Sequence, residues 1–392
     1  MALSRSSPPD MSELLNSDTM PSLRVSTPGC TLARKEPMKS TSETRRSLPG
    51  FSTAIAAVVL AAAVFAGPPG PDPAAAPLQN VLELDGDVGG VHDPTVIKDG
   101  SRYYLFSTGG RAGQGVIPIR TSTDLRSWKS SGFVFPALPD WAAREIPQAR
   151  NAWAPDISHY GGRFRLYYSV SSFGSRNSAI GLATTPTLDP SSPRYGWVDD
   201  GLVLRSFQDK DDWNAIDPNL VIEDDKNVWL TWGSFWGGIK MRRIDPATGR
   251  LSATDTALYS LSSRPREAPI GGSVEAPVII RNGDYWYLFV SFDRCCRGAD
   301  STYNVVVGRS RDIRGPYLDK KGQSMTDGGG SLVIGATSAT WRGPGHQAVL
   351  RDAGRDYLFF HAYYGADLGR GSALQISTMI WDDGWPRVGA LP

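Results

Sequence analysis

Hydrophobic and polar positions from residue 91 onward follow one repeated pattern. A short run rich in Val, Ile and Leu leads into Asp, Asn or Gly, and a run rich in Tyr, Trp and Phe follows. This order is typical of a β-hairpin, because β-branched and aromatic residues favour strands and small polar residues favour turns. The five copies are HDPTVIKDGSRYYLF from His92, APDISHYGGRFRLYY from Ala154, IDPNLVIEDDKNVWLTW from Ile216, VEAPVIIRNGDYWYLFV from Val274 and GHQAVLRDAGRDYLFFH from Gly345.

A third strand is expected after each hairpin, and no long segment with helical periodicity intervenes. These strands are expected from Ile117, Ala179, Ile239, Val305 and Leu374. Aligned on a polar position, the copies recur every 58 to 71 residues, a spacing that suits a four-stranded propeller blade with its loops. The sequence therefore predicts an all-β fold, a five-bladed β-propeller over residues 81–392. A β-sandwich with accidental internal similarity is the alternative, and the regular period disfavours it.

The first 80 residues have a different composition. Residues 1–50 are rich in Ser, Pro, Thr and charge, so we expect a disordered leader, whose true start could be Met38. Residues 51–66 form an apolar run that ends in small residues, as in a signal peptide, and 67–80 form a Pro, Gly and Ala spacer. The pair Arg45-Arg46 before the run could suit twin-arginine export. A secreted protein is expected, with a retained membrane anchor as the alternative.

Charge and cysteine content exclude several classes of protein. Residues 67–392 carry 34 basic and 35 acidic residues, so nothing indicates a nucleic-acid partner. Three cysteines cannot form a framework of several disulfides. For the adjacent Cys295 and Cys296 we expect two thiols, because a bond between neighbours constrains the peptide between them. We expect a monomer without a stable membrane partner.

The acidic positions of the repeat carry the candidate chemistry. Starts of the innermost strands of a propeller converge at one mouth of the central channel, so the aligned side chains should approach one ring. Carboxylates gathered in a partly desolvated pocket split into proton donor and proton acceptor, which is the equipment for hydrolysing a glycosidic bond. The aligned residues are Asp93, Asp156, Asp217, Glu275 and His346.

Residues 88–388 resemble glycoside hydrolase family 43, and in particular its endo-1,5-α-L-arabinanases. The motifs that carry this resemblance are VHDPTV at Val91, NAWAPDI at Asn151, NAIDPNL at Asn214, WGSFWGGI at Trp232, GGSVEAP at Gly271, FDRCCRG at Phe292, STYNVVVGRS at Ser301 and GPGHQAV at Gly343.

The resemblance implies an inverting mechanism on arabinan. Asp93 looks like the general base, Glu275 like the general acid, and Asp217 like the carboxylate that orients the acid and sustains its pKa. Asp156 would be structural or position the substrate.

The resemblance also implies a sugar-binding surface and a metal ion. Trp153, Phe173 and Asn151 look like substrate-binding residues, with blade packing as the alternative for the aromatic pair. His346 is expected near a calcium ion held largely through water, although Gln347 replaces the Asn that commonly follows this His in the family.

Two other functions stay open. The first is an exo-acting α-L-arabinofuranosidase or β-xylosidase on the same fold; similar exo enzymes often carry an additional β-sandwich, for which this sequence shows no room. The second is a non-catalytic carbohydrate-binding propeller, disfavoured because all three catalytic carboxylates are present.

Overall fold

The structure is a computed structural model that describes residues 81–388 except 112, 336–339 and 366–370. The predicted leader, apolar run and spacer lie outside the described residues. Among the described helices, none is long and apolar enough to cross a membrane.

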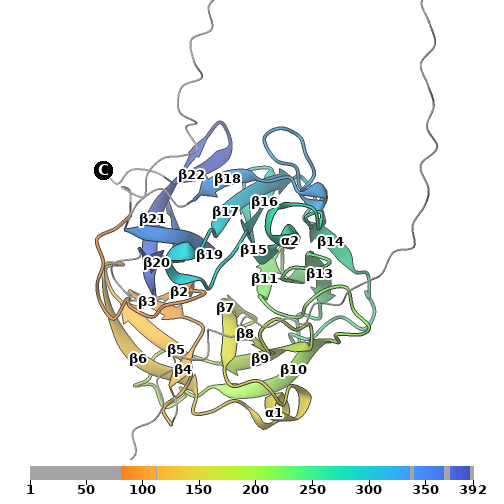
Figure 1. Cartoon of the computed structure of the whole chain (residues 1–392). Coiled ribbons are helices and arrows are strands. Elements are labelled where there is room, and N and C mark those ends of the chain that lie inside the picture. The colour runs from red at the N-terminus through yellow and green to blue at the C-terminus, as the bar shows by residue number, and fades with distance from the viewer. Residues whose placement is uncertain (1–80, 112, 336–339, 366–370, 389–392) are drawn as a thin grey trace, which may run out of the picture. The chain divides into compact units, whose positions relative to one another are not determined.

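Five sheets, antiparallel except for one parallel pairing in the first, lie around a common centre, so the predicted five-bladed propeller is confirmed (Figure 1). The first blade contains β1 (Asp85–Gly86), β2 (Thr95–Asp99), β3 (Arg102–Phe106), β4 (Gly110–Arg111), β5 (Gly115–Ser122) and β6 (Ser127–Phe135). The second contains β7 (Ala152–Tyr160), β8 (Arg163–Ser171), β9 (Ser178–Thr185) and β10 (Val198–Ser206). The third contains β11 (Asn219–Ile222), β12 (Val228–Trp232), β13 (Ile239–Ile244) and β14 (Tyr259–Ser262).

The last two blades follow the same order. The fourth contains β15 (Val274–Asn282), β16 (Tyr285–Phe292), β17 (Asn304–Ser310) and β18 (Ser331–Ile334). The fifth contains β19 (Trp341–Asp352), β20 (Arg355–Tyr364), β21 (Ser372–Asp382) and β22 (Trp385–Val388). Short helices occur in the connections: α1 (Asp140–Glu145), α2 (Pro269–Gly272), η4 (Gly298–Asp300) and η5 (Met325–Asp327). The third strands β5, β9, β13, β17 and β21 lie where the sequence predicts them.

Residues 81–90 close the ring between the last blade and the first. The outer strand β22 pairs only with the end of β21, from Met379 onward. Bridges from Val81 to Ser377 and from Gly89 to Ala373 cover the rest of that edge, and β1 pairs with β6 of the first blade. Behind this segment, a shared hydrophobic core fills the space between the two blades; it includes Leu82, Val91, Trp128, Phe359 and Ile376.

The predicted alignment of the acidic positions is wrong in two blades. In each blade, one non-glycine residue with positive φ lies at or near the start of the first strand. These residues occupy equivalent positions in the five blades: Asp93, Ala154, Asp217, Ala276 and His346. Asp156 lies two residues after the positive-φ residue of its blade and Glu275 one residue before. The difference arises because the carboxyl occupies another position of the motif in these blades. A proline follows the positive-φ residue directly in four blades (Pro94, Pro155, Pro218 and Pro277), whereas the acidic residue lies after that proline in the second blade and before the positive-φ residue in the fourth.

The same five positions connect neighbouring blades. Their backbone N–H groups donate to side chains of the preceding blade: Asp93 to His361 Nδ1, Ala154 to Thr108 Oγ1, Asp217 to Ser169 Oγ, Ala276 to Asp217 Oδ2 and His346 to Ser291 Oγ. Each acceptor satisfies a polar group that the inner edge of a blade would otherwise leave unpaired. The chemistry-bearing residues are therefore built on backbone that is fixed from two blades.

Candidate active site

Asp93 is a buried carboxylate surrounded by histidines. Its Oδ1 lies 3.0 Å from Nδ1 of His346 and 2.7 Å from Nδ1 of His92, the latter at ion-pair distance without the alignment of a hydrogen bond. Thr108 donates its hydroxyl to Oδ2. His361 lies on the same side and accepts the backbone N–H of Asp93 at 3.1 Å. First-blade and fifth-blade residues thus build this side of the site together.

The charges around Asp93 keep it ionised. Burial alone would raise its pKa, but His346 and His92 together hold the pKa of Asp93 well below its usual range. Burial lowers the pKa of His346, yet Asp93, Asp217 and Glu275 outweigh it and raise that pKa to about 9. Burial also keeps the pKa of His361 well below its ordinary value, so His361 is neutral. Asp93 and His346 therefore form an ion pair at neutral pH.

The pKa of Glu275 is shifted in the opposite direction from that of Asp93. Only 8% of its surface is exposed, and Ser234 donates its hydroxyl to Oε2 at 2.7 Å. Burial raises the pKa of Glu275, and the hydrogen bonds from Ser234 and Tyr303 lower it by less. Ser234 comes from the loop between β12 and β13, in which Phe235 and Trp236 both have positive φ. This loop of the third blade fixes the position of Glu275 in the fourth, while burial raises the pKa of Glu275.

Asp217 links the third blade to the backbone beside Glu275. Its Oδ2 accepts the N–H of Ala276 at 3.1 Å. Burial raises the pKa of Asp217 to about 8; His346 opposes this rise, and the charges of Glu275 and Asp93 add to it. Because repulsion between carboxylates is mutual, Asp217 and Glu275 do not ionise together readily. Asp217 is therefore placed to orient Glu275 through the backbone beside it.

The surroundings of Asp93 and Glu275 shift the pKa values of these two carboxyl groups in opposite directions. Asp93 is ionised and can accept a proton, whereas burial raises the pKa of Glu275, which therefore keeps its proton to higher pH. A pair of carboxyls whose surroundings separate their pKa values in this way is suited to general acid and base chemistry. The predicted catalytic residues Asp93, Asp217 and Glu275 are brought together with His346 at one mouth of the channel, as their shared electrostatic interactions show.

Asp156 has a structural environment. Its Oδ2 accepts the backbone N–H of Leu220 at 2.8 Å and its Oδ1 accepts Nδ2 of Asn219 at 3.0 Å, both in the next blade. Asn219 in turn accepts the N–H of Ile279 in the fourth blade at 3.0 Å. Burial raises the pKa of Asp156 to about 7. These contacts form a ladder between inner strands, so the structural interpretation of Asp156 is favoured.

The predicted sugar-binding residues come from the second blade. Trp153 is half-buried and pairs with Ser169, whose hydroxyl accepts the N–H of Asp217, and so it lies beside the acid cluster. Phe173 follows β8 at the same mouth with 84% of its surface exposed. Asn151 precedes β7 and accepts the N–H of Ala152 at 3.0 Å. An exposed aromatic ring at this mouth offers a flat apolar surface of the kind on which a sugar ring can stack.

The surroundings of His346 do not form a cage for calcium. Ca²⁺ takes six to eight oxygen ligands, whereas His346 offers an imidazole whose Nδ1 faces Asp93. Gln347 is occupied, since its Oε1 accepts from Ser291 and its Nε2 donates to the carbonyl of Ala276. Among the described residues, the candidate three-ligand groups do not include His346. Direct coordination of calcium by these side chains does not fit.

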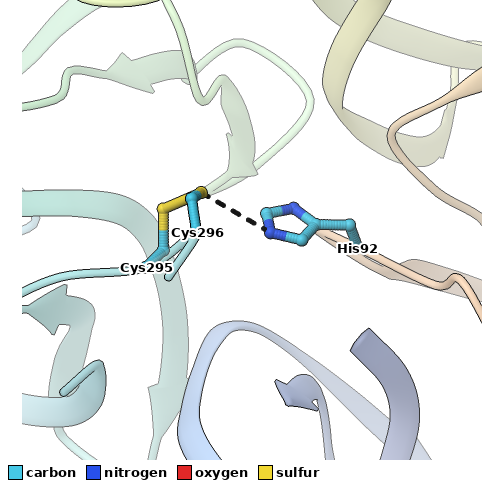
Figure 2. A group of neighbouring side chains, drawn as sticks. All are labelled: His92, Cys295 and Cys296. Atoms are coloured by element: carbon cyan, nitrogen blue, oxygen red, sulfur yellow. Dashed lines mark hydrogen bonds between the residues drawn. A yellow bond between two sulfur atoms is a disulfide. The ribbon is translucent and has the colours of Figure 1, made fainter. Parts of the chain in front are cut away.

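The expectation of two thiols at Cys295 and Cys296 is wrong, because the two residues form a disulfide (Figure 2). Cys296 has a φ of 66°, which lets the chain turn so that both sulfur atoms lie on one side. Its Sγ lies 3.8 Å from Nε2 of His92. The FDRCCRG segment of the fourth blade thus reaches the carboxylate site of the first.

Several residues of the site were not predicted. His92, Thr108, Ser234, Tyr303 and His361 contact the catalytic candidates. His92, Ser234 and Tyr303 lie within the motifs already quoted, so their sequence neighbourhood was a usable signal. Thr108 lies just after β3, and His361 lies within β20. Their contacts with Asp93 and Ala154 depend on how the strands and blades pack, which the sequence did not indicate.

Comparisons with known proteins agree with this geometry. The sequence model of glycosyl hydrolases family 43 matches residues 88–386. An "Extracellular exo-alpha-(1->5)-L-arabinofuranosidase ArbA" of Cellvibrio japonicus is 44% identical over 306 residues, 76% of this chain and 86% of that protein. An "Extracellular endo-alpha-(1->5)-L-arabinanase 1" of Bacillus subtilis is 42% identical over 297 residues, 76% of this chain and 87% of that protein.

A solved structure gives the same result. The "GH43 Endo-Arabinanase from Bacillus licheniformis" superimposes with a TM-score of 0.70 at 46% identity, covering 78% of this chain and 99% of that one. The matched region contains every carboxyl group described above. This chain belongs to the glycosyl hydrolases of family 43.

Proposed function

We propose that this protein is an extracellular arabinanase that hydrolyses internal α-1,5-L-arabinofuranosidic bonds of arabinan. One observation carries the proposal: a carboxylate kept ionised by histidines, Asp93, shares a channel mouth with a carboxyl whose pKa is raised by burial, Glu275. The substrate class is supported by the names of the relatives, which act on α-1,5-linked arabinose and are called extracellular. Export by the twin-arginine route belongs to the same proposal.

The proposed reaction is an inverting hydrolysis. Asp93 accepts a proton from water as that water attacks the anomeric carbon, and Glu275 donates its proton to the leaving oxygen. The bond from the anomeric carbon to the leaving oxygen breaks, and each product gains a hydroxyl group. Asp217 accepts the backbone N–H of Ala276 and so orients the neighbouring Glu275. His346 stays charged beside Asp93 and keeps the base from being protonated prematurely.

Internal cleavage requires that sugars bind on both sides of the carboxyls. Trp153 beside the acid cluster and the exposed Phe173 on the following loop supply aromatic surface along one direction from the site. Stacking on such rings contributes to sugar binding without fixing the chain end. We therefore favour endo action.

Exo action is the second candidate, because one relative at 44% identity is named an exo-α-(1→5)-L-arabinofuranosidase. The two modes are separated by digesting linear 1,5-α-arabinan and sizing the earliest products. Endo action releases mixed oligosaccharides and lowers the viscosity of the solution early. A single short product from the first turnovers would support exo action, and faster cleavage of aryl xylosides than of arabinan would contradict both.

We retain a calcium ion as a proposal, in the form of an ion held through water near His346. Removing it with a chelator should lower the melting temperature, and added Ca²⁺ should restore it. An unchanged melting curve in chelator would contradict the proposal. A monomeric state is likewise proposed, and light scattering of the purified protein tests it.

A further inference from the structure

The disulfide and a tyrosine lie behind the proposed base. We propose that Tyr363 and the Cys295–Cys296 disulfide are positioning residues that hold the imidazole of His92 against the carboxylate of Asp93. The inference rests on the proposed function, because it takes Asp93 as the general base. The structure connects the three elements by contacts that cross from the fourth blade to the fifth and on to the first.

The Tyr363 hydroxyl is the centre of this chain of contacts. It accepts the backbone N–H of Cys296 at 2.9 Å and lies 2.6 Å from Nε2 of His92. A hydroxyl can donate to a neutral imidazole and accept from a protonated one, so it serves as the partner of Nε2 in either state. Burial raises the pKa of Tyr363 far above its ordinary value, so the hydroxyl keeps its proton.

His92 needs such a partner because Nδ1 lies close to Asp93 without an aligned hydrogen bond and the ring is otherwise held mainly by stacking. The ring lies on that of His361 with centroids 3.8 Å apart and an interplanar angle of 22°. Stacking fixes the plane of the imidazole but permits a flip about the Cβ–Cγ bond, which would exchange the nitrogen positions with carbon positions. Nearly a quarter of the His92 side chain, 23%, is exposed, so the ring can turn toward solvent. The bond from Tyr363 to Nε2 sets the rotation that directs Nδ1 to Asp93.

The disulfide fixes the other end of the chain. Cys296 has a left-handed backbone conformation, which is unfavourable for residues other than glycine. The covalent ring between adjacent cysteines limits the dihedral angles of both residues and so retains that conformation. The N–H of Cys296 therefore stays directed at the Tyr363 hydroxyl (the disulfide faces His92 in Figure 2). Cys296 is exposed, so a soluble reductant reaches the bond.

The first experiment replaces the hydroxyl alone. Tyr363→Phe keeps the ring and removes both hydrogen bonds, and we expect kcat on linear arabinan to fall about 10- to 100-fold, the usual cost of losing a supporting contact. KM should change by less than about threefold, since no binding group is removed. Tyr167→Phe is the matched control, because it removes a buried tyrosine hydroxyl that bonds to the carbonyl of Gly249. Its kcat should equal that of the wild type.

The second experiment opens the disulfide. A dithiol reductant supplies two electrons and two protons, the Sγ–Sγ bond breaks, two thiols form, and the reagent becomes a cyclic disulfide. We expect kcat of the wild type to fall several-fold as Cys295 and Cys296 become open to alkylation, which mass spectrometry of the peptide measures. The double variant Cys295→Ser, Cys296→Ser should show the lowered kcat without reductant and no further change with it.

Each outcome decides the inference. Unchanged kcat in the reduced wild type, with both cysteines alkylated, overturns the role of the disulfide. Unchanged kcat in Tyr363→Phe overturns the role of Tyr363. A rise in KM at constant kcat would make these residues substrate contacts and would also overturn it. Failure of the proposed function is distinguishable, because the wild type would then leave arabinan uncleaved or Asp93→Asn would keep its activity.

Discussion

At the scale of single residues, the site works by giving two similar carboxyls different neighbours. Both Asp93 and Glu275 are buried, and burial raises the pKa of each. Asp93 meets two histidines, whereas Glu275 meets the hydroxyls of Ser234 and Tyr303. A positive charge favours ionisation much more than a hydroxyl does. The proposed assignment of Asp93 as base and Glu275 as acid rests on this difference.

Removing either carboxyl should therefore abolish most of the activity. We expect Asp93→Asn and Glu275→Gln each to lower kcat by about 10²- to 10⁴-fold, the usual contribution of one proton-transfer group. Rates on linear arabinan and circular dichroism spectra measure activity and folding side by side. Asp284→Asn is the control, since that side chain is 80% exposed in a turn of the fourth blade. Near-normal kcat in either catalytic variant would refute its assignment.

Asp217 gives a prediction about stability and pH. Its pKa is about 8 in the folded protein and near 3.8 when unfolded, so the folded state holds a proton that the unfolded state releases in between. The stability that protonated Asp217 contributes is fully present below about pH 4, where the folded and unfolded states both hold the proton. It is lost as the pH rises through about 8. Asp217→Asn keeps an acceptor for the N–H of Ala276 and carries no charge. We expect the wild type to lose more melting temperature than Asp217→Asn between pH 5 and pH 8.

Parallel melting curves for the two proteins over this range would contradict the raised pKa of Asp217. The pH–rate profile gives an independent measurement. The role that the family resemblance implies for Asp217, sustaining the pKa of Glu275, predicts that a neutral replacement moves the basic limb of kcat/KM to lower pH. A limb that stays in place would leave Asp217 only an orienting role.

At the scale of strands, the hairpins could be predicted from the sequence, but acidic residues alone did not give the correct alignment of the five copies. Alternation and turn residues predict every first, second and third strand, because they report which residues face a core. Aligning copies on acidic residues failed at Asp156 and Glu275, because the carboxyl does not stand at the same position in every copy; the prolines Pro94, Pro155, Pro218 and Pro277 mark the equivalence instead. The pairing of Cys295 with Cys296 was missed for another reason: it depends on the left-handed backbone at Cys296, which residue type does not indicate.

Asp156 shows what the corrected register implies. Its two oxygens accept from Leu220 and Asn219, and Asp156→Asn leaves one of these donors facing an amide N–H₂. We expect a loss of roughly 1–3 kcal/mol in the free energy of unfolding, the cost of an unsatisfied buried donor. Chemical denaturation measures this loss. The kcat of the folded variant should stay near that of the wild type, and a large fall at unchanged stability would return Asp156 to the catalytic group.

At the scale of the whole propeller, catalysis depends on how the ring is closed. Asp93 belongs to the first blade, while His346, His361 and Tyr363 belong to the fifth, so the base exists only where the ends of the ring meet. Residues 81–90 hold these blades together through the bridges to β21 and the burial of Leu82. If the first and fifth blades separated, the other blades would keep their contacts, but Asp93 would lose its contacts with His346 and His361.

Shortening the closing segment should therefore damage activity and stability together. We compare a chain that begins at residue 81 with one that begins at residue 91. The shorter chain loses the burial of Leu82, worth about 1.5–3 kcal/mol, and the bonds from Leu82 N–H to Ile376 and from Leu374 N–H to Val88, worth about 0.5–1.5 kcal/mol each. We expect its melting temperature to fall by about 5 °C or more.

The kinetic outcome separates closure from general destabilisation. Because the missing segment supports the contact between the first and fifth blades, kcat per folded molecule should fall, measured well below the melting temperature of the shorter chain. Leu220→Ala, a core truncation in the third blade, is the control: it lowers stability through a cavity while leaving the closure intact. Equal kcat per folded molecule in the shortened chain and in this control would show that the fifth blade holds Asp93 without help from residues 81–90.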